Sequence, residues 1–190
     1  MPSSPRNRIA ALLLAVAAAG YPFLVYATLG RVPPGALIVV ALAVVGGRMA
    51  LLGRGGAARA LLPALGGVFV ATGATALLDA EAAVTLYPVL MSLGFAAAFG
   101  LSLRRPPTLV ETFASLRHPD PSVAARAYMR RVTWVWFAFL LLNAAVSAIT
   151  ALSGDMVLWT AYNGFVSYVL MGLLFAGEWL VRRRVEARAA

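Results

Sequence analysis

Long runs of apolar residues are the feature that most limits how this chain can fold. Six such runs occupy most of the sequence and contain few charges. At a rise of about 1.5 Å per residue, a helix of about 20 residues spans the hydrocarbon core of a bilayer. Lipid offers no hydrogen-bond partners, so a spanning segment satisfies its own backbone as a helix. We therefore predict an all-α bundle of six transmembrane spans, at 9–29, 35–52, 60–78, 82–103, 132–152 and 157–181.

The composition agrees with a membrane domain. Hydrophobic residues make up 62% of the chain and charged residues 12%, whereas soluble domains carry about 25% charged residues. We expect a single transmembrane domain over residues 1–190. The chain has no cysteine and one histidine, His118, which excludes disulfides, thiolate metal sites and histidine-rich metal sites. We expect no metal and no cofactor.

The distribution of charge predicts the orientation of the spans. The net charge is +9, and all sixteen cationic side chains are arginine. With the N-terminus in the cytoplasm, the cytoplasmic segments hold every arginine except Arg31, while the outer turns hold Asp79, Glu81 and Asp155. The positive-inside rule therefore places both termini in the cytoplasm. Because the arginines flank apolar runs and form no separate basic domain, nucleic acid is not an expected partner.

The first run has a second interpretation as a signal peptide, with cleavage near Ala15-Val16-Ala17. Its apolar character continues through Tyr26, which is longer than the usual core of a signal peptide. This length favours a span that is retained.

The segment 104–131 is the longest connection between runs, and its sequence predicts local structure. Thr108 and Glu111 have the spacing of a capping box, in which each side chain accepts a hydrogen bond from the backbone amide of the other. A short amphipathic helix over 109–117, lying in the inner interface, follows from this start. Asp120 and Pro121 form a second helix start, and this helix is expected to continue into the span at 132–152.

Eight residues of this segment are candidates for contact with a partner protein or with lipid. They are Arg104, Arg105, Pro106, Pro107, Thr108, Glu111, His118 and Asp120. The arginines either anchor the segment among lipid headgroups or converge on one phosphate as a specific site for an anionic lipid or polyprenyl phosphate. His118 and Asp120 are either an acid–base pair or residues that end one helix and begin the next. The absence of a neighbouring nucleophile or metal partner in the sequence favours the second interpretation.

Polar residues inside the apolar runs form stripes at helical spacing. The three stripes are Asn143, Ser147 and Thr150; Asn163, Ser167 and Glu178; and Thr72, Thr75 and Asp79. They either join helices through hydrogen bonds, which are worth about 0.6 kcal/mol each in membranes, or line a polar cavity. Our candidate intramembrane polar site consists of Asn143, Ser147, Asn163, Ser167 and Glu178.

Glu178 has two interpretations of its own, because it is the only carboxylate within a run. It lies four residues before Arg182, which is the spacing of an ion pair along one helix. The alternative is a site for proton coupling or for the ammonium group of a substrate. Its position close to the end of the run favours the ion pair.

A short sequence echo links the two halves of the chain. Tyr21-Pro22 in the first run is repeated as Tyr87-Pro88 in the fourth. The echo is either the trace of an inverted repeat of three spans, as in several transporters, or two ordinary proline kinks.

From Tyr87 to the C-terminus, the sequence resembles a known family. The resemblance is carried by a proline-bearing span, by the segment 105–111, by Trp136-Phe137 through Leu142-Asn143, and by Trp159 with Tyr162-Asn163. These motifs resemble the bacterial septation-protein-A-like membrane family (the YciB/IspZ type). They are closer still to a branch found beside acyltransferase and acyl-ligase genes in aryl-polyene-type lipid pigment clusters. The resemblance implies a multi-pass protein of the bacterial inner membrane that is linked to cell-envelope synthesis and has no established catalytic residue.

Two functions follow as hypotheses. The first is a non-enzymatic inner-membrane protein that supports envelope or aryl-polyene-like lipid assembly through contacts with lipids and with other proteins of envelope or lipid synthesis. The second is a small transporter or flippase for a lipid-linked product. An intramembrane enzyme ranks last, because the sequence offers no paired carboxylates, no metal-ligand set and no nucleophile with a base.

Overall fold

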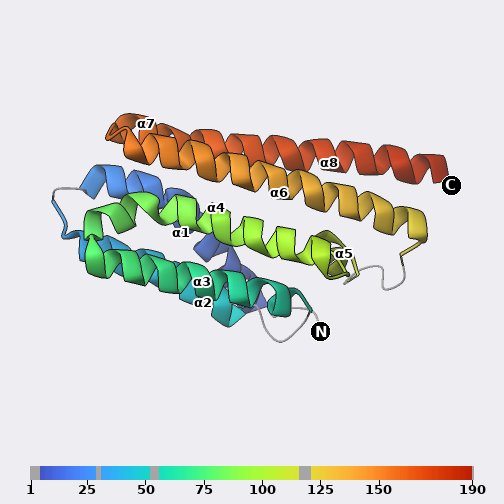
Figure 1. Ribbon diagram of the computed structural model, residues 1–190, viewed down its shortest axis with the longest axis horizontal. Helices are drawn as coiled ribbons and strands as arrows, with labels where there is room; N and C mark the ends of the chain where they lie inside the picture. The colour runs from blue at the N-terminus through green and yellow to red at the C-terminus, as the bar shows by residue number, and fades with distance from the viewer. Residues whose placement is uncertain (1–4, 29–30, 52–55, 116–120, 190) are drawn as a thin grey trace.

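The computed structural model describes residues 5–28, 31–51, 56–115 and 121–189, and every element in these ranges is a helix. The helices are α1 (Pro5–Thr28), α2 (Pro34–Leu51), α3 (Gly56–Leu78), α4 (Ala80–Arg104), α5 (Leu109–Ala114), α6 (Val123–Leu152), α7 (Met156–Ala161), the π-helical turn η1 (Tyr162–Val166) and α8 (Ser167–Ala189). The long helices run side by side as a bundle, with α4 between α3 and α6 (Figure 1).

Five stretches of helix are long and apolar enough to cross a membrane. They are Pro34–Leu51, Leu61–Leu78, Ala80–Arg104, Val123–Leu152 and Met156–Arg184, with mean hydropathies between 1.6 and 2.0. Large apolar side chains cover their outer surface: Leu77 and Leu78, for example, are each 90% exposed. Water would disfavour such a surface and lipid would not, so these helices indicate a multi-pass membrane protein. The remaining predicted span, 9–29, overlaps helix α1 (Pro5–Thr28), which is not among these five stretches.

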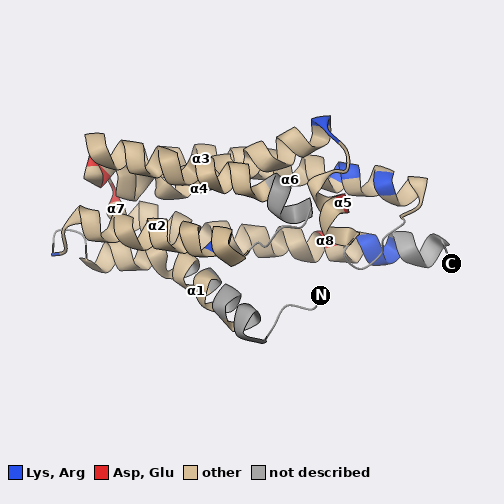
Figure 2. Ribbon diagram, turned by 90° about the horizontal axis from the view of Figure 1, so that it is seen from below, with Lys and Arg blue, Asp and Glu red and all other residues tan. Residues whose placement is uncertain are grey.

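Charged residues separate to the two ends of the bundle. One end carries Asp79, Glu81 and Asp155, and the other carries α5 and most of the arginines (Figure 2). We call these the acidic end and the basic end. At the acidic end, Asp79 caps α4 and Asp155 caps α7, each by accepting two backbone N–H groups at distances of 2.8 to 3.0 Å. These carboxylates therefore satisfy the first amides of the helices that follow the turns.

A proline inside α4 explains one set of contacts in the core. Pro88 lacks an N–H, so the carbonyl of Val84, four residues earlier, loses its helical partner. The hydroxyl of Tyr21 on α1 donates to this carbonyl at 3.4 Å, and the indole Nε1 of Trp159 donates to the neighbouring carbonyl of Thr85 at 3.0 Å. Both rings are buried. Side chains of α1 and α7 thus replace the hydrogen bonding that proline disturbs in α4.

The same arrangement occurs at the proline of α1. Pro22 frees the carbonyl of Ala18, and the hydroxyl of Tyr168 on α8 donates to it at 3.1 Å. The two Tyr-Pro elements also meet, because the rings of Tyr21 and Tyr87 pack edge to face with centroids 4.8 Å apart. The sequence echo therefore corresponds to a real contact between α1 and α4.

Replacing Tyr21 with phenylalanine is expected to destabilise the bundle. The change leaves the Val84 carbonyl without its tyrosine donor in an apolar core, at a cost of about 1 kcal/mol. Thermal unfolding of the purified protein in detergent, followed by circular dichroism, measures this cost. The control is Tyr26→Phe, since Tyr26 is 52% exposed. Equal melting temperatures for the two variants would contradict a stabilising hydrogen bond from Tyr21 to the Val84 carbonyl.

The connection between α4 and α6 differs from its prediction in two places. The hydroxyl of Thr108 accepts the Glu111 amide at 3.4 Å, as predicted, and α5 begins at Leu109 but ends at Ala114. The predicted start of the next helix at Asp120-Pro121 is wrong, because α6 begins at Val123 and Ser122 is its cap. The Ser122 hydroxyl accepts a hydrogen bond from the Ala125 amide at 3.2 Å, which is the capping role predicted for Asp120. The predicted continuation of this helix into the span is confirmed by the 30 residues of α6.

A candidate ligand cavity between the helices

A cavity of about 740 Å³ lies inside the bundle. Residues of α1, α2, α4, α5, α6, η1 and α8 line it, and we call it the central cavity. Its volume is within the range of about 300 to 1,000 Å³ that is typical of sites for small molecules and cofactors. Along η1 and α8 its lining extends from Asn163 to Glu178, a distance of about 22 Å at 1.5 Å per residue. The central cavity is therefore long enough for an extended hydrocarbon chain.

A network of hydrogen-bonded polar side chains lies at one part of the central cavity. The Asn143 amide on α6 donates from Nδ2 to the Ser92 hydroxyl of α4 at 2.9 Å. Its Oδ1 accepts the hydroxyl of Tyr162 on η1 at 3.0 Å. Asn143 is 7% exposed and faces the central cavity. It thus joins three helices, and its remaining exposure is toward the interior space.

Asn163 is the centre of a second set of hydrogen bonds. Its Oδ1 accepts the Ser147 hydroxyl at 2.6 Å, and its Nδ2 donates to the Thr150 hydroxyl at 3.2 Å and to the Trp159 carbonyl at 2.9 Å. Ser167 adds a bond from its hydroxyl to the Asn163 carbonyl at 3.3 Å. The predicted stripes of α6 and of the last span therefore converge.

The π-helical turn η1 sets the position of Asn163. Over Tyr162–Val166 the backbone bonds widen, and the Ser167 amide bonds to the Tyr162 carbonyl. Such a turn adds one residue to the helix and is common at functional sites. In this turn Gly164 approaches α1 so closely that an added Cβ would lie 2.8 Å from the Phe23 ring. A larger residue at this position would have to displace the Phe23 ring, which is 49% exposed.

The part of the central cavity at the basic end carries charge. The Arg182 Nε lies 3.7 Å from Glu178 Oε1, so the predicted pair along one helix is confirmed. The Tyr128 hydroxyl of α6 also lies 3.3 Å from the Glu178 carbonyl and 3.5 Å from its Oε1. Glu178 and Arg182 both line the central cavity.

Aromatic side chains form the walls between these polar parts. The rings of Trp136 on α6 and Phe175 on α8 have centroids 4.5 Å apart, and Phe99 of α4 lies 6.1 Å from Trp136. These ring contacts connect α8 to α6 and α6 to α4. The central cavity therefore has apolar walls with polar groups toward its ends, which is the pattern of an amphipathic ligand.

Sequence reasoning missed most of the lining of the central cavity, including four arginine and tyrosine residues. Arg48 on α2, with Tyr21, Tyr87 and Tyr168, lines the cavity. Arg48 was interpreted only as part of the charge bias. Its position inside the apolar run 35–52 was the available signal, because an arginine within a span is costly and usually functional.

The candidate loop residues that the structure describes lie in different surroundings. Thr108 is buried as the cap of α5, and Glu111 lies 3.7 Å from the Nε of Arg126. Arg104 and Pro106 are exposed. His118 and Asp120 lie outside the residues that the structure describes.

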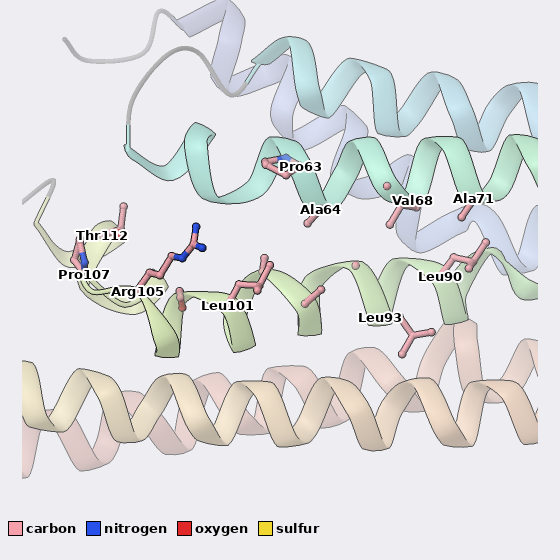
Figure 3. A pocket seen from close by; sticks show the side chains of 15 residues that line it. Pro63, Ala64, Val68, Ala71, Leu90, Leu93, Leu101, Arg105, Pro107 and Thr112 are labelled. Atoms are coloured by element: carbon pink, nitrogen blue, oxygen red, sulfur yellow. The ribbon is translucent and has the colours of Figure 1, made fainter.

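Arg105 and Pro107 line a second hollow, which lies outside the central cavity. This α3–α4 groove has a volume of about 740 Å³ and is lined largely by small and apolar residues such as Ala64, Gly67 and Gly94. In Figure 3 the Arg105 side chain extends toward α3 at the end of the groove near α5. Arg130 lies apart from this groove's lining, and its Nη1 donates to the Leu103 carbonyl at 3.0 Å. Arg105 and Arg130 therefore have separate surroundings.

The third stripe is not part of either cavity. Thr72 is 1% exposed, with no hydrogen-bond partner for its hydroxyl, and Thr75 donates to the Ala71 carbonyl of its own helix at 2.9 Å. Among the described residues there is no group of three or more histidine, aspartate or glutamate side chains that could hold a metal ion.

No protein-family model, curated protein or solved structure matches this chain. The fold and the cavity define its class by themselves. It is a helical multi-pass membrane protein with an interior cavity that has apolar walls and polar groups toward both ends.

Proposed function

We propose that this protein binds an amphipathic, lipid-type molecule in the central cavity and moves it between the leaflets of the membrane. The observation that carries the proposal is the 740 Å³ cavity itself, which is lined mostly by helices long and apolar enough to span a membrane. Its apolar walls suit a hydrocarbon chain, and its polar groups suit a headgroup. This is the function of a small transporter or flippase for a lipid-linked product.

Polar groups at both ends of the central cavity favour transport of the ligand over static binding of it. Asn143 and Asn163 lie in one part of the lining, while Glu178 lies about 22 Å and Arg182 about 28 Å from Asn163 along the helix. A headgroup that leaves one polar part therefore has a second polar part to enter. A cavity that only anchored a chain would need one such part.

The setting that fits this proposal is a bacterial inner membrane with six spans and both termini in the cytoplasm. The charge separation between the two ends of the bundle supports that orientation. The resemblance to septation-protein-A-like proteins and to the lipid pigment branch supports a role in envelope or lipid assembly. A lipid-linked product of such a pathway is a suitable cargo for the central cavity.

A vesicle assay tests the proposal. The full-length protein is reconstituted with trace amounts of fluorescent phosphatidylglycerol, phosphatidylethanolamine or phosphatidic acid, and dithionite then bleaches the outer leaflet. We expect faster bleaching of the inner pool of at least one probe than in protein-free vesicles. No acceleration for any of the three probes would overturn the transport function.

A non-enzymatic docking role for the loop 104–131 is the second candidate, since Arg104 and Pro106 are exposed at the basic end. In a strain that lacks the gene, the two functions predict opposite rankings of how strongly two sets of substitutions impair complementation. Docking predicts that Arg104→Ala with Arg105→Ala abolishes complementation, while blocking the central cavity with Met171→Trp has little effect. Transport predicts that the Met171 variant is the more severe. Complementation by each variant, at equal amounts of folded protein, measures this order.

A further inference from the structure

Arg48 places a positive charge on the central cavity that the protein itself does not neutralise. It lies on α2, one turn before the helix ends at Leu51, and lines the central cavity. It has no ion pair or hydrogen bond with any residue that the structure describes. Glu178 is the only carboxylate in the described lining, and it already pairs with Arg182. The lining therefore has one excess positive charge.

Tyr87 supplies a second group without a partner. Its side chain is 4% exposed, and its hydroxyl has no hydrogen-bond partner. The other two cavity tyrosines are committed to proline-freed carbonyls, Tyr21 to Val84 and Tyr168 to Ala18. Of the three, Tyr87 is thus the one whose buried hydroxyl forms no hydrogen bond with the described protein.

Both groups line the central cavity. The Arg48 charge lies near enough to the hydroxyls of Tyr87 and Tyr168 to act on both electrostatically. An arginine inside a membrane usually has a partner, because its charge is costly to hold in a poorly solvated interior. A buried hydroxyl without a hydrogen bond is costly too. One anionic group placed between them would satisfy both.

We propose that Arg48 and Tyr87 bind the anionic headgroup, a phosphate or a carboxylate, of the amphiphile that enters the central cavity. The guanidinium offers paired N–H donors to two oxygens of such a group, and the tyrosine O–H donates to a further one. The nearby aromatic walls at Phe95 and Phe99 hold the hydrocarbon chain. The inference rests on the proposed function, since it names the sign of the molecule that the cavity accepts.

Binding of matched probes tests the inference. The full-length protein in phosphatidylcholine nanodiscs is equilibrated with dodecyl phosphate, dodecanoate, dodecyltrimethylammonium, dodecanol or inorganic phosphate, and empty nanodiscs supply the background. We expect one or both anionic amphiphiles to bind about tenfold more tightly than the cationic and neutral ones. The two anionic arms show whether phosphate or carboxylate is preferred. Tight binding of inorganic phosphate without a chain would overturn the amphiphile assignment.

Substitutions locate this preference. Arg48→Gln is expected to remove the preference for anions, and Tyr87→Phe to weaken anion binding by about threefold to tenfold. Arg48→Lys should keep the sign of the preference, and it provides the test if the glutamine variant does not fold. Arg184→Gln is the matched control for total charge, because Arg184 is exposed on α8 and does not line the central cavity.

The outcomes separate this inference from the proposed function. If all dodecyl probes bind equally, or if the Arg48 variants keep the full preference for anions, the headgroup inference is wrong while the cavity remains a binding site. If no dodecyl probe exceeds the background of empty nanodiscs, the proposed function fails, and the inference fails with it.

Discussion

Met171→Trp is expected to abolish lipid translocation while leaving a folded protein. Met171 lies on α8, midway between Asn163 and Glu178, and faces the central cavity. An indole at this position occupies space that the ligand's chain needs. Forcing a chain past it costs about 1–3 kcal/mol, which corresponds to about fivefold to 150-fold weaker binding. The vesicle assay with dithionite measures the loss as a return of the bleaching rate to that of protein-free vesicles.

The control for this substitution lies two residues further along the same helix. Leu173 is 64% exposed on the outer surface of α8 and does not line the central cavity. Leu173→Trp adds the same side chain to the same helix and should translocate at the wild-type rate. Both variants should elute from gel filtration as the wild type does. Undiminished translocation by folded Met171→Trp would show that lipid does not pass through the central cavity.

Asn163→Ala is expected to cause the largest loss of stability among substitutions in the polar network. The change removes the partner of the Ser147 and Thr150 hydroxyls and of the Trp159 carbonyl. At about 0.6 kcal/mol for each side-chain hydrogen bond in a membrane, three bonds contribute about 2 kcal/mol. Ser147 is 0% exposed, so water cannot replace the lost partner. Reversible unfolding in mixed micelles measures the difference in free energy.

Phe165→Ala is the control for this second prediction. Phe165 belongs to the same π-helical turn but is 64% exposed. Its loss should change the free energy of unfolding by no more than about 0.5 kcal/mol. If Asn163→Ala unfolds at the same denaturant concentration as Phe165→Ala, the hydrogen-bond network does not stabilise the packing of η1 on α6.

The helices could be predicted because one physical requirement dominates them. A backbone in lipid has to form its own hydrogen bonds, so each long apolar run becomes a helix of matching length. The runs at 35–52 and 82–103 correspond to α2 and α4 within two residues at each end. The convergence of Asn143 and Asn163 followed from the same logic, because polar side chains in a span turn toward the protein interior. The number of spans and their orientation stay predictions.

The residues that sequence reasoning missed depend on distances between segments far apart in the chain. Nothing local to Tyr21 indicates that its hydroxyl meets a carbonyl that Pro88 has freed on another helix. Arg48 resembled an ordinary flanking charge until its side chain was located on the central cavity. The cap of α6 was misplaced for a different reason. Ser122 and Asp120 are both good caps, and the sequence alone could not rank them.

The placement of prolines beside the central cavity connects the fold to the function. Pro22 and Pro88 both line the cavity, and the carbonyls that they free are bound by Tyr168 and Tyr21. These hydrogen bonds fix the tyrosine rings as part of the wall. The Tyr87 hydroxyl has no such partner, and Arg48 lines the same cavity. The lining thus has two tyrosines that donate to backbone carbonyls and one tyrosine with an unpaired hydroxyl.

Photolabelling in vesicles is the most direct test of the claim that lipid enters the central cavity. A phospholipid with a diazirine in its acyl chain is incorporated with the protein, irradiated and mapped to labelled residues by mass spectrometry. The account predicts labels on inward-facing residues such as Met91, Phe95 and Met171, in addition to the outer surface at Leu173. Met171→Trp should remove the inward labels and leave the outer ones. Labels confined to outward-facing residues in the wild-type protein would contradict the account.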